Sequence, residues 1–143
     1  MIVAEFDIPV YFIQEFKRKP NKTWIAGLNW YRNSHFAIQN SVKQHYHELI
    51  AKLLEPQIVP PICPLLSYKV SYIYYYKNLQ SDMPNVLAFS SKVCNDIFQE
   101  LGYVVNDNVQ HLIEEHYYVG GRDSNNPRAH VVLETYERQD TLG

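Results

Sequence analysis

Apolar and polar positions alternate along residues 2–8 of the chain. The apolar positions on one face of this run are Ile2, Ala4, Phe6 and Ile8. A period of two predicts a strand, and Pro9, which has no N–H for a ladder, ends it. Residues 14–33 keep neither a strand nor a helix period and contain several turn formers, so we expect an irregular segment there.

From Ser34 onward the apolar residues recur at intervals of three and four. The positions are Phe36, Val42, Tyr46, Leu49, Ile50, Leu53 and Leu54. This spacing predicts a helix that stops before Pro56. The prolines between Val59 and Pro64 then predict a stiff connector.

A second strand pattern and a second helix pattern follow. Residues 66–76 alternate and predict a strand, with one face formed by Leu66, Tyr68, Val70, Tyr72, Tyr74 and Tyr76. Residues 85–101 return to helical spacing, and Gly102 supplies the stop. The core positions expected on this helix are Val86, Phe89, Val93, Ile97 and Leu101.

The last third of the chain predicts two more strands, over residues 109–119 and 128–136. We expect them to form an antiparallel hairpin whose loop contains Gly120 and Gly121, and we expect the last seven or so residues to be frayed. The order of elements predicts one α+β domain over residues 1–143, with a mixed or antiparallel sheet and two main helices.

Composition supports a globular domain, since 46% of the 143 residues are hydrophobic. Cys63 and Cys94 form no C-x-x-C pair, which favours two reduced thiols. We find no leader pattern and no apolar run of membrane-spanning length, so we expect a cytoplasmic protein without a membrane partner. The 12 tyrosines favour half-buried strands over a stacking or protein-binding surface.

Charge is distributed unevenly along the chain. The net charge is −2, yet residues 17–52 hold seven basic residues against Glu48 alone. The segment of about 14–55, a basic loop followed by the first helix, is therefore our candidate for DNA phosphate contacts. Its candidate residues are Lys17, Arg18, Lys19, Lys22, Arg32 and Lys43. A merely solvated basic loop would have the same composition.

The region of about 82–108 collects the residues that could carry chemistry. Asp82 precedes the predicted helix, Lys92 and Asp96 share one helix face, and Asp107 follows the helix. Asn85 lies two turns before Lys92 on the same side. Taken alone, the pattern fits a solvated helix with an aspartate at its start and another in a turn better than it fits a catalytic site. The histidines are not spaced as metal ligands, and we expect no histidine-centred metal site.

As an ordered set over residues 2–136, these features resemble the RusA family of Holliday junction resolvases, in particular its phage-type members. The motifs that carry the resemblance are Leu28–Asn33, Ser81–Asn85, Lys92, Asp96, Leu101-Gly102 and Asn106–Gln110. Two positions and one spacing depart from the family pattern, the spacing being the gap from Asn85 to Lys92, which is four residues longer than usual. Pro84 stands where the family usually has a second aspartate, and Asn106 stands at the first position of its usual acidic pair.

The resemblance implies a Mg²⁺-dependent endonuclease, with Mn²⁺ as a substitute, that nicks branched DNA such as a four-way junction in recombination, repair or phage DNA processing. It implies Asp82, Lys92 and Asp107 as catalytic residues, Asn85 and Asp96 as supporting residues, and Asp82, Asp96 and Asp107 as metal ligands. It also implies a homodimer in a bacterial or phage-infected cell. The alternative is a non-enzymatic branched-DNA-binding protein, which Pro84 would permit. A second, more distant alternative is a protein-interaction module that uses the tyrosine-rich strand.

Overall fold

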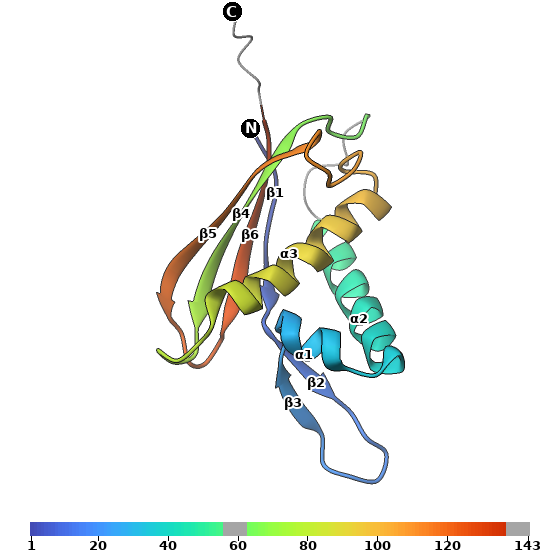
Figure 1. Ribbon diagram of the computed structural model, residues 1–143, viewed down its shortest axis with the longest axis vertical. Helices are drawn as coiled ribbons and strands as arrows, with labels where there is room; N and C mark the ends of the chain where they lie inside the picture. The colour runs from blue at the N-terminus through green and yellow to red at the C-terminus, as the bar shows by residue number, and fades with distance from the viewer. Residues whose placement is uncertain (56–62, 137–143) are drawn as a thin grey trace, which may run out of the picture.

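A mixed sheet of four strands forms the centre of the structure, a computed structural model that describes residues 1–55 and 63–136 (Figure 1). The strands are β1 (Ile2–Pro9), β4 (Tyr68–Tyr76), β5 (Leu112–Arg122) and β6 (Arg128–Thr135), in the spatial order β1-β6-β4-β5. β6 runs antiparallel to both of its neighbours, whereas β5 runs parallel to β4. The predicted α+β class is confirmed. The predicted connector lies largely outside the described residues, as does the predicted frayed end.

Tyrosines of β4 form much of the core beneath the helices. Tyr68, Tyr72 and Tyr74 alternate along the strand and are almost completely buried. β4 is flanked by β5 and β6, so a large aromatic ring at each inward position is covered on both sides. The expectation that tyrosines line the strands rather than an exposed surface is confirmed for these three.

Two long helices, α2 (Phe36–Leu54) and α3 (Met83–Glu100), lie on one face of the sheet (Figure 1). α3 contacts β4, β5 and α2, and α2 also contacts β1. Aromatic pairs join the layers: Phe6 meets Phe98 edge to face, and Tyr46 meets Phe89 in the same way. Both predicted helices are confirmed. Among the residues that the structure describes, no helix is long and apolar enough to cross a membrane.

The segment of residues 14–33 contains regular elements on both sides of a loop at residues 15–21, so the expectation of an irregular segment was wrong outside that loop. β2 (Tyr11–Gln14) and β3 (Lys22–Ile25) pair as a separate antiparallel hairpin, and α1 (Leu28–Asn33) follows. Each of these strands has only four residues, which is too short for an alternation to stand out from chance. The hairpin extends away from the sheet at one end of the molecule (Figure 1).

The predicted antiparallel hairpin of β5 and β6 was also wrong. β5 pairs with β4 at the edge of the sheet, and β6 inserts between β1 and β4. Helix α3 provides the crossover that a parallel β4–β5 pair needs, and the inward residues of β6 are apolar enough for a central strand. β5 also begins later than predicted, because Val109 is 92% exposed in a turn.

Gly120 and Gly121 lie within β5 and do not form a hairpin loop, which corrects a further expectation. A Cβ atom on Gly120 would come within 2.8 Å of side-chain atoms of Ile73 and Tyr75, so only glycine allows this close approach. Gly121 has φ +145°, which also favours glycine. The connection to β6 instead turns at Asp123, whose carboxylate accepts the N–H of Asn126 at 3.1 Å.

His130 joins two carboxylates of β1 on the sheet face that the helices leave uncovered. Its Nδ1 lies 2.7 Å from Asp7 Oδ1 and its Nε2 lies 2.6 Å from Glu5 Oε1, so a protonated ring donates to both. Burial alone would lower the pKa of His130. The hydrogen bonds and negative charges of Glu5 and Asp7 outweigh burial and raise that pKa above its ordinary value.

We expect this raised pKa to make the protein less stable as the pH rises. The stabilisation is complete below the unfolded-state pKa of about 6.5 and is lost as the pH rises through the higher folded-state pKa. Thermal unfolding followed by circular dichroism between about pH 6 and pH 9 should show a modest fall in Tm that is smaller in His130→Gln. An identical pH dependence in both proteins would contradict this role of His130.

Candidate nucleic-acid interface

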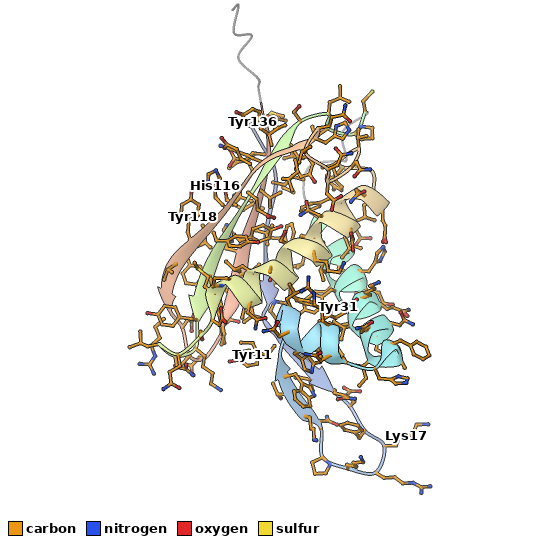
Figure 2. The ribbon with its side chains drawn as sticks, viewed as in Figure 1. Tyr11, Lys17, Tyr31, His116, Tyr118 and Tyr136 are labelled. Carbon is orange, nitrogen blue, oxygen red and sulfur yellow. The ribbon has the colours of Figure 1, made fainter. Side chains whose placement is uncertain are left out.

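The hairpin of β2 and β3 places the basic run at its tip. Lys17, Arg18 and Lys19 are exposed in the loop of residues 15–21, and Lys22 begins β3. Lys17 lies at the far end of the hairpin, away from the sheet (Figure 2). Lys19 and Lys22 approach the rings of Phe16 and Trp24, at 5.1 and 5.7 Å from the ring centroids. The hairpin thus carries both cations and aromatic rings.

An aromatic cluster fastens the base of this hairpin to α1 and α2. Phe12 of β2 is buried, with ring centroids 5.9 Å from Trp30 of α1 and 5.4 Å from His45 of α2. Trp24 stacks on Trp30 at 6.0 Å and 21°. The isolated pair of short strands would be marginally stable in water, so this cluster is what holds the hairpin in a defined position.

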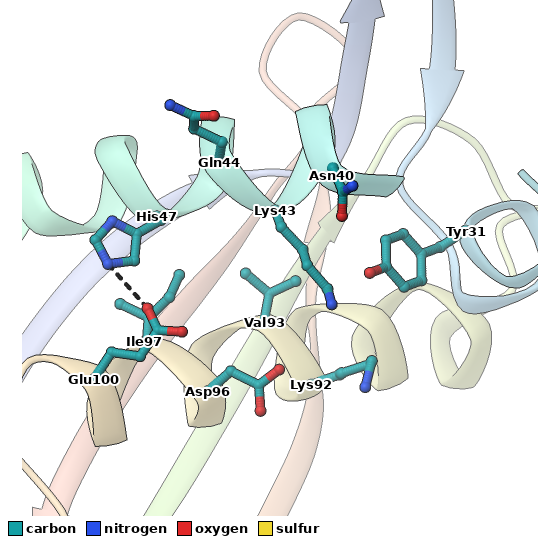
Figure 3. Close-up of a pocket in the computed structure, with 10 residues that line it drawn as sticks. All are labelled: Tyr31, Asn40, Lys43, Gln44, His47, Lys92, Val93, Asp96, Ile97 and Glu100. Atoms are coloured by element: carbon teal, nitrogen blue, oxygen red, sulfur yellow. Dashed lines mark ion pairs between the residues drawn. The ribbon is translucent and has the colours of Figure 1, made fainter. Parts of the chain in front are cut away.

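A groove of about 290 Å³ runs between α2 and α3 (Figure 3). Lys43 of α2 faces Lys92 and Asp96 of α3 across it, and Tyr31 of α1 closes one end. Lys43 reaches from α2 toward α3 (Figure 3). Neither lysine forms an ion pair with a described residue, so both ammonium groups remain available to an anion.

An ion pair lies at the opposite end of the groove from Tyr31. His47 Nε2 of α2 lies 3.0 Å from Glu100 Oε2 of α3, and both side chains are substantially exposed. Asp96 stands one turn before Glu100 along α3. The groove therefore has a cationic part around Lys43 and Lys92 and a more acidic part toward the C-terminal end of α3.

Asp82 acts as the N-cap of α3. Its carboxylate accepts the N–H of Asn85 at 3.2 Å, and Pro84 occupies the first turn, where its missing N–H costs nothing. The side chain of Asp82 is exposed. The two residues thus begin a helix in an ordinary way, and Pro84 contributes no ligand beside Asp82.

Asn85 bonds to the backbone of α1 and does not line the groove with Lys92. Its Oδ1 accepts the N–H of Asn29 at 2.9 Å, and its carboxamide packs directly on Gly27. Gly27 itself has no side chain to cap α1. Asn85 supplies that missing acceptor from another helix, which makes it a positioning residue for α1 and, through α1, for the hairpin.

Replacing Asn85 by alanine should lower the free energy of unfolding by about 1 kcal/mol, the usual cost of losing a helix cap. Asn29→Ala is the matched control, because the donor at Asn29 is the backbone N–H, which the substitution retains. Urea titrations of the two variants and the wild type provide the measurement. Equal stability of both variants would show that the Asn85 contact contributes nothing.

Asp107 lies beyond the C-terminal end of α3, in a turn where Asn106 Oδ1 accepts the N–H groups of Asp107 and Asn108 at 2.7 and 3.2 Å. The 18 residues of α3 separate it from Asp82, and a helix of that length spans about 27 Å. The charge of Asp107 acts instead on Tyr68 at the start of β4, where burial and then this charge raise the tyrosine pKa. The structure therefore does not bring Asp82 and Asp107 together within one chain.

The three aspartates do not fit a shared Mg²⁺ centre in one chain. Asp82, Asp96 and Asp107 are spread from one end of α3 to the other. In the part of the chain that the structure describes, no group of three or more histidine, cysteine, aspartate or glutamate side chains could hold a metal ion. Mg²⁺ binds through carboxylates that converge within about 2 Å of the ion, which this spacing prevents.

A polar network beneath α3, buried at Tyr68 and Asn95 and exposed at Glu115, was not expected from the sequence. Tyr68 donates to Asn95 Oδ1 at 2.9 Å, Asn95 donates to the backbone of Ser91, and Ser91 donates to Glu115. Nearby, burial raises the pKa of the Cys94 thiol far above its ordinary value, so Cys94 stays protonated and unreactive. These groups tie α3 to β4 and β5 and explain the polar positions on the inner side of the helix.

Two features of the interface went unpredicted, and the sequence contains a signal for only the first of them. Phe12, Phe16 and Trp24 flank the basic run on both sides, and aromatic residues beside lysines are typical of nucleic-acid surfaces. Lys43 and Lys92 come from different helices, and only the packing of α2 against α3 makes them neighbours. Arg32 is exposed in the last turn of α1, a helix that lies between the hairpin and α3 (Figure 1).

Comparisons with known proteins leave this interface unassigned. The chain matches no model of a protein family, and no curated protein matches it either.

Proposed function

We propose that this chain binds branched DNA through the hairpin of β2 and β3. The observation that carries the proposal is the projecting basic tip, with Lys17, Arg18, Lys19 and Lys22 exposed on a hairpin anchored by aromatic rings. Cations on a slender, fixed element reach DNA phosphates without bringing the acidic remainder of the chain close to them. The choice of branched DNA follows the resemblance to junction resolvases.

The basic positions continue from the hairpin toward the helices. Arg32 lies on α1, which stands between the hairpin and α3 (Figure 1), and Lys43 and Lys92 follow in the groove. Phosphate contacts of this kind position a DNA arm but read no sequence. We therefore propose binding that depends on DNA shape and ionic strength, with little preference for base sequence.

Metal-dependent nicking is the second candidate function, and the groove between α2 and α3 favours it. Lys92 and Lys43 would contact a backbone phosphate there, beside the carboxylate of Asp96. Within one chain, however, the predicted ligands do not converge, so the binding function is the better supported of the two.

A homodimer is part of this proposal. A four-way junction has approximate two-fold symmetry, and two copies related by a two-fold axis would present two hairpins to two arms. Light scattering of the protein with and without junction DNA measures the number of copies in each state.

The direct test compares a synthetic four-way junction with a linear duplex of the same arm sequences. Fluorescence anisotropy should give tighter binding to the junction, and an affinity that falls steeply as salt is raised. Repeating the titration with EDTA or added Mg²⁺ and resolving the products on denaturing gels tests for nicking. Absence of binding to either DNA at low salt would end the proposal.

A further inference from the structure

Trp24 is held in place on one side and remains partly open on another. Its ring stacks on Trp30, its indole N–H donates to Gln14 Oε1 at 3.1 Å, and it is 36% exposed. Both contacting residues belong to regular elements, since Gln14 is on the paired strand β2 and Trp30 is on α1. The orientation of this indole ring is therefore set before anything binds to it.

The surroundings of Trp24 are cationic. Lys22 Nζ lies 5.7 Å from the centroid of the indole ring, and Lys17, Arg18 and Lys19 follow in the adjoining loop. A partner that places an aromatic ring against Trp24 would therefore carry negative charge beside that ring. An unpaired nucleotide, with a flat base and a phosphate, has this combination.

We infer that Trp24 is a stacking platform for an unpaired base next to the DNA branch point. The inference rests on the proposed DNA binding and adds a preference for branch points with unpaired bases over fully paired linear DNA. Bases of a continuous duplex already stack on their neighbours, so Trp24 has no free base face to meet there. At a branch point, an unpaired base can leave the stack and take up the prearranged ring.

The simpler role for Trp24 is to cover Phe12 and Trp30 at the base of the hairpin. Phe12 and Trp24 are paired across β2 and β3, so packing alone would account for a large apolar side chain at this position. The two roles differ in what they require. Packing needs only apolar volume, whereas stacking needs an aromatic face.

The test uses Trp24→Leu, which keeps apolar volume, and Trp24→Phe, which keeps an aromatic ring. Ile13→Ala is the matched control, because Ile13 is exposed on β2 in the same hairpin but belongs to the opposite face. Anisotropy titrations use a forked DNA with unpaired arms and a fully paired duplex, at one salt concentration. Trp24→Leu should bind the fork about tenfold more weakly and the duplex almost unchanged, and Trp24→Phe should retain most of the affinity.

A fluorescent base analogue, 2-aminopurine, placed in the unpaired arm next to the fork gives a direct readout. Stacking on an indole quenches it, so wild-type protein should lower its emission, while Trp24→Leu should not. This measurement on the wild type also decides the matter if Trp24→Leu does not fold.

Several results would overturn the inference while leaving DNA binding intact. These include an equal loss for fork and duplex in Trp24→Leu, no loss for either, and no quenching by a wild-type protein that binds the fork. Failure of the wild type to bind any DNA would instead overturn the proposed function itself, and the inference with it. The loss in Ile13→Ala should be small for both DNAs, and a fork-selective loss there as large as in Trp24→Leu would likewise refute the platform.

Discussion

Replacing Lys17, Arg18 and Lys19 together by glutamine is expected to weaken junction binding at about 0.1 M salt. The largest expected loss of affinity is on the order of 10²-fold. Each phosphate contact contributes about 0.9 to the slope of log affinity against log salt concentration. Removal of three contacts should therefore lower that slope by up to roughly three units. The three side chains are exposed at the tip of the hairpin, so the substitution should leave the fold intact.

The control for this prediction removes the same net charge elsewhere. Lys52, Lys69 and Arg122 lie on α2, β4 and β5, outside the hairpin, and their joint replacement by glutamine should change the salt slope much less. Salt titrations of both triple variants, read by anisotropy, provide the comparison. Equal slopes for the two variants would mean that the hairpin has no special part in binding and that only total charge matters.

Lys92→Ala is expected to lower the rate of junction nicking by on the order of 10²-fold or more. That is the usual loss when a preorganised charge facing a reacting phosphate is removed. Lys92 lines the groove beside Lys43 and Asp96, and its exposed ammonium pairs with no described residue, so its removal should not disturb the core. Binding should weaken far less than the nicking rate, because the hairpin is unchanged.

Lys52→Ala serves as the control for Lys92, since Lys52 is also an exposed helical lysine but does not line the groove. The measurement is a single-turnover nicking rate on one four-way junction with added Mg²⁺ or Mn²⁺. Normal nicking by Lys92→Ala would remove the groove from the candidate reaction. A wild type that binds junctions but nicks none of them would leave binding as the function.

Much of the fold could be predicted because the long elements repeat their pattern many times. α3 presents Val86, Phe89, Val93 and Ile97 to the core at helical spacing over 18 residues, and β4 alternates over nine. The hairpin of β2 and β3 repeats its pattern too few times to be recognised. The apolar pattern of a strand also does not indicate which other strand it pairs with. For this reason β5 was predicted to pair with β6 and not with β4.

The candidate site was less predictable than the fold, because distance along the chain is a poor guide to distance in space. Asp82 and Asp107 flank the same helix in the sequence, and that helix is what keeps them apart. Lys92 and Asp96 were predicted to share a face, and both line the groove, because residues four apart on a helix are neighbours whatever packs against them. Their proximity to Lys43 depends on helix packing, which no local pattern contains.

The position of β6 in the sheet also has a consequence for how the chain acquires its structure. Among the described strands of the main sheet, β1 pairs with β6 alone, and Ile2 pairs with Glu134. During synthesis β1 leaves the ribosome before the other strands of the sheet but must wait, unpaired, until β6 has followed it. Such pairing between distant segments slows folding. The backbone edge of β1 therefore stays unpaired for longer than that of any other strand in the sheet, and an unpaired edge is a place where a nascent chain is prone to aggregate.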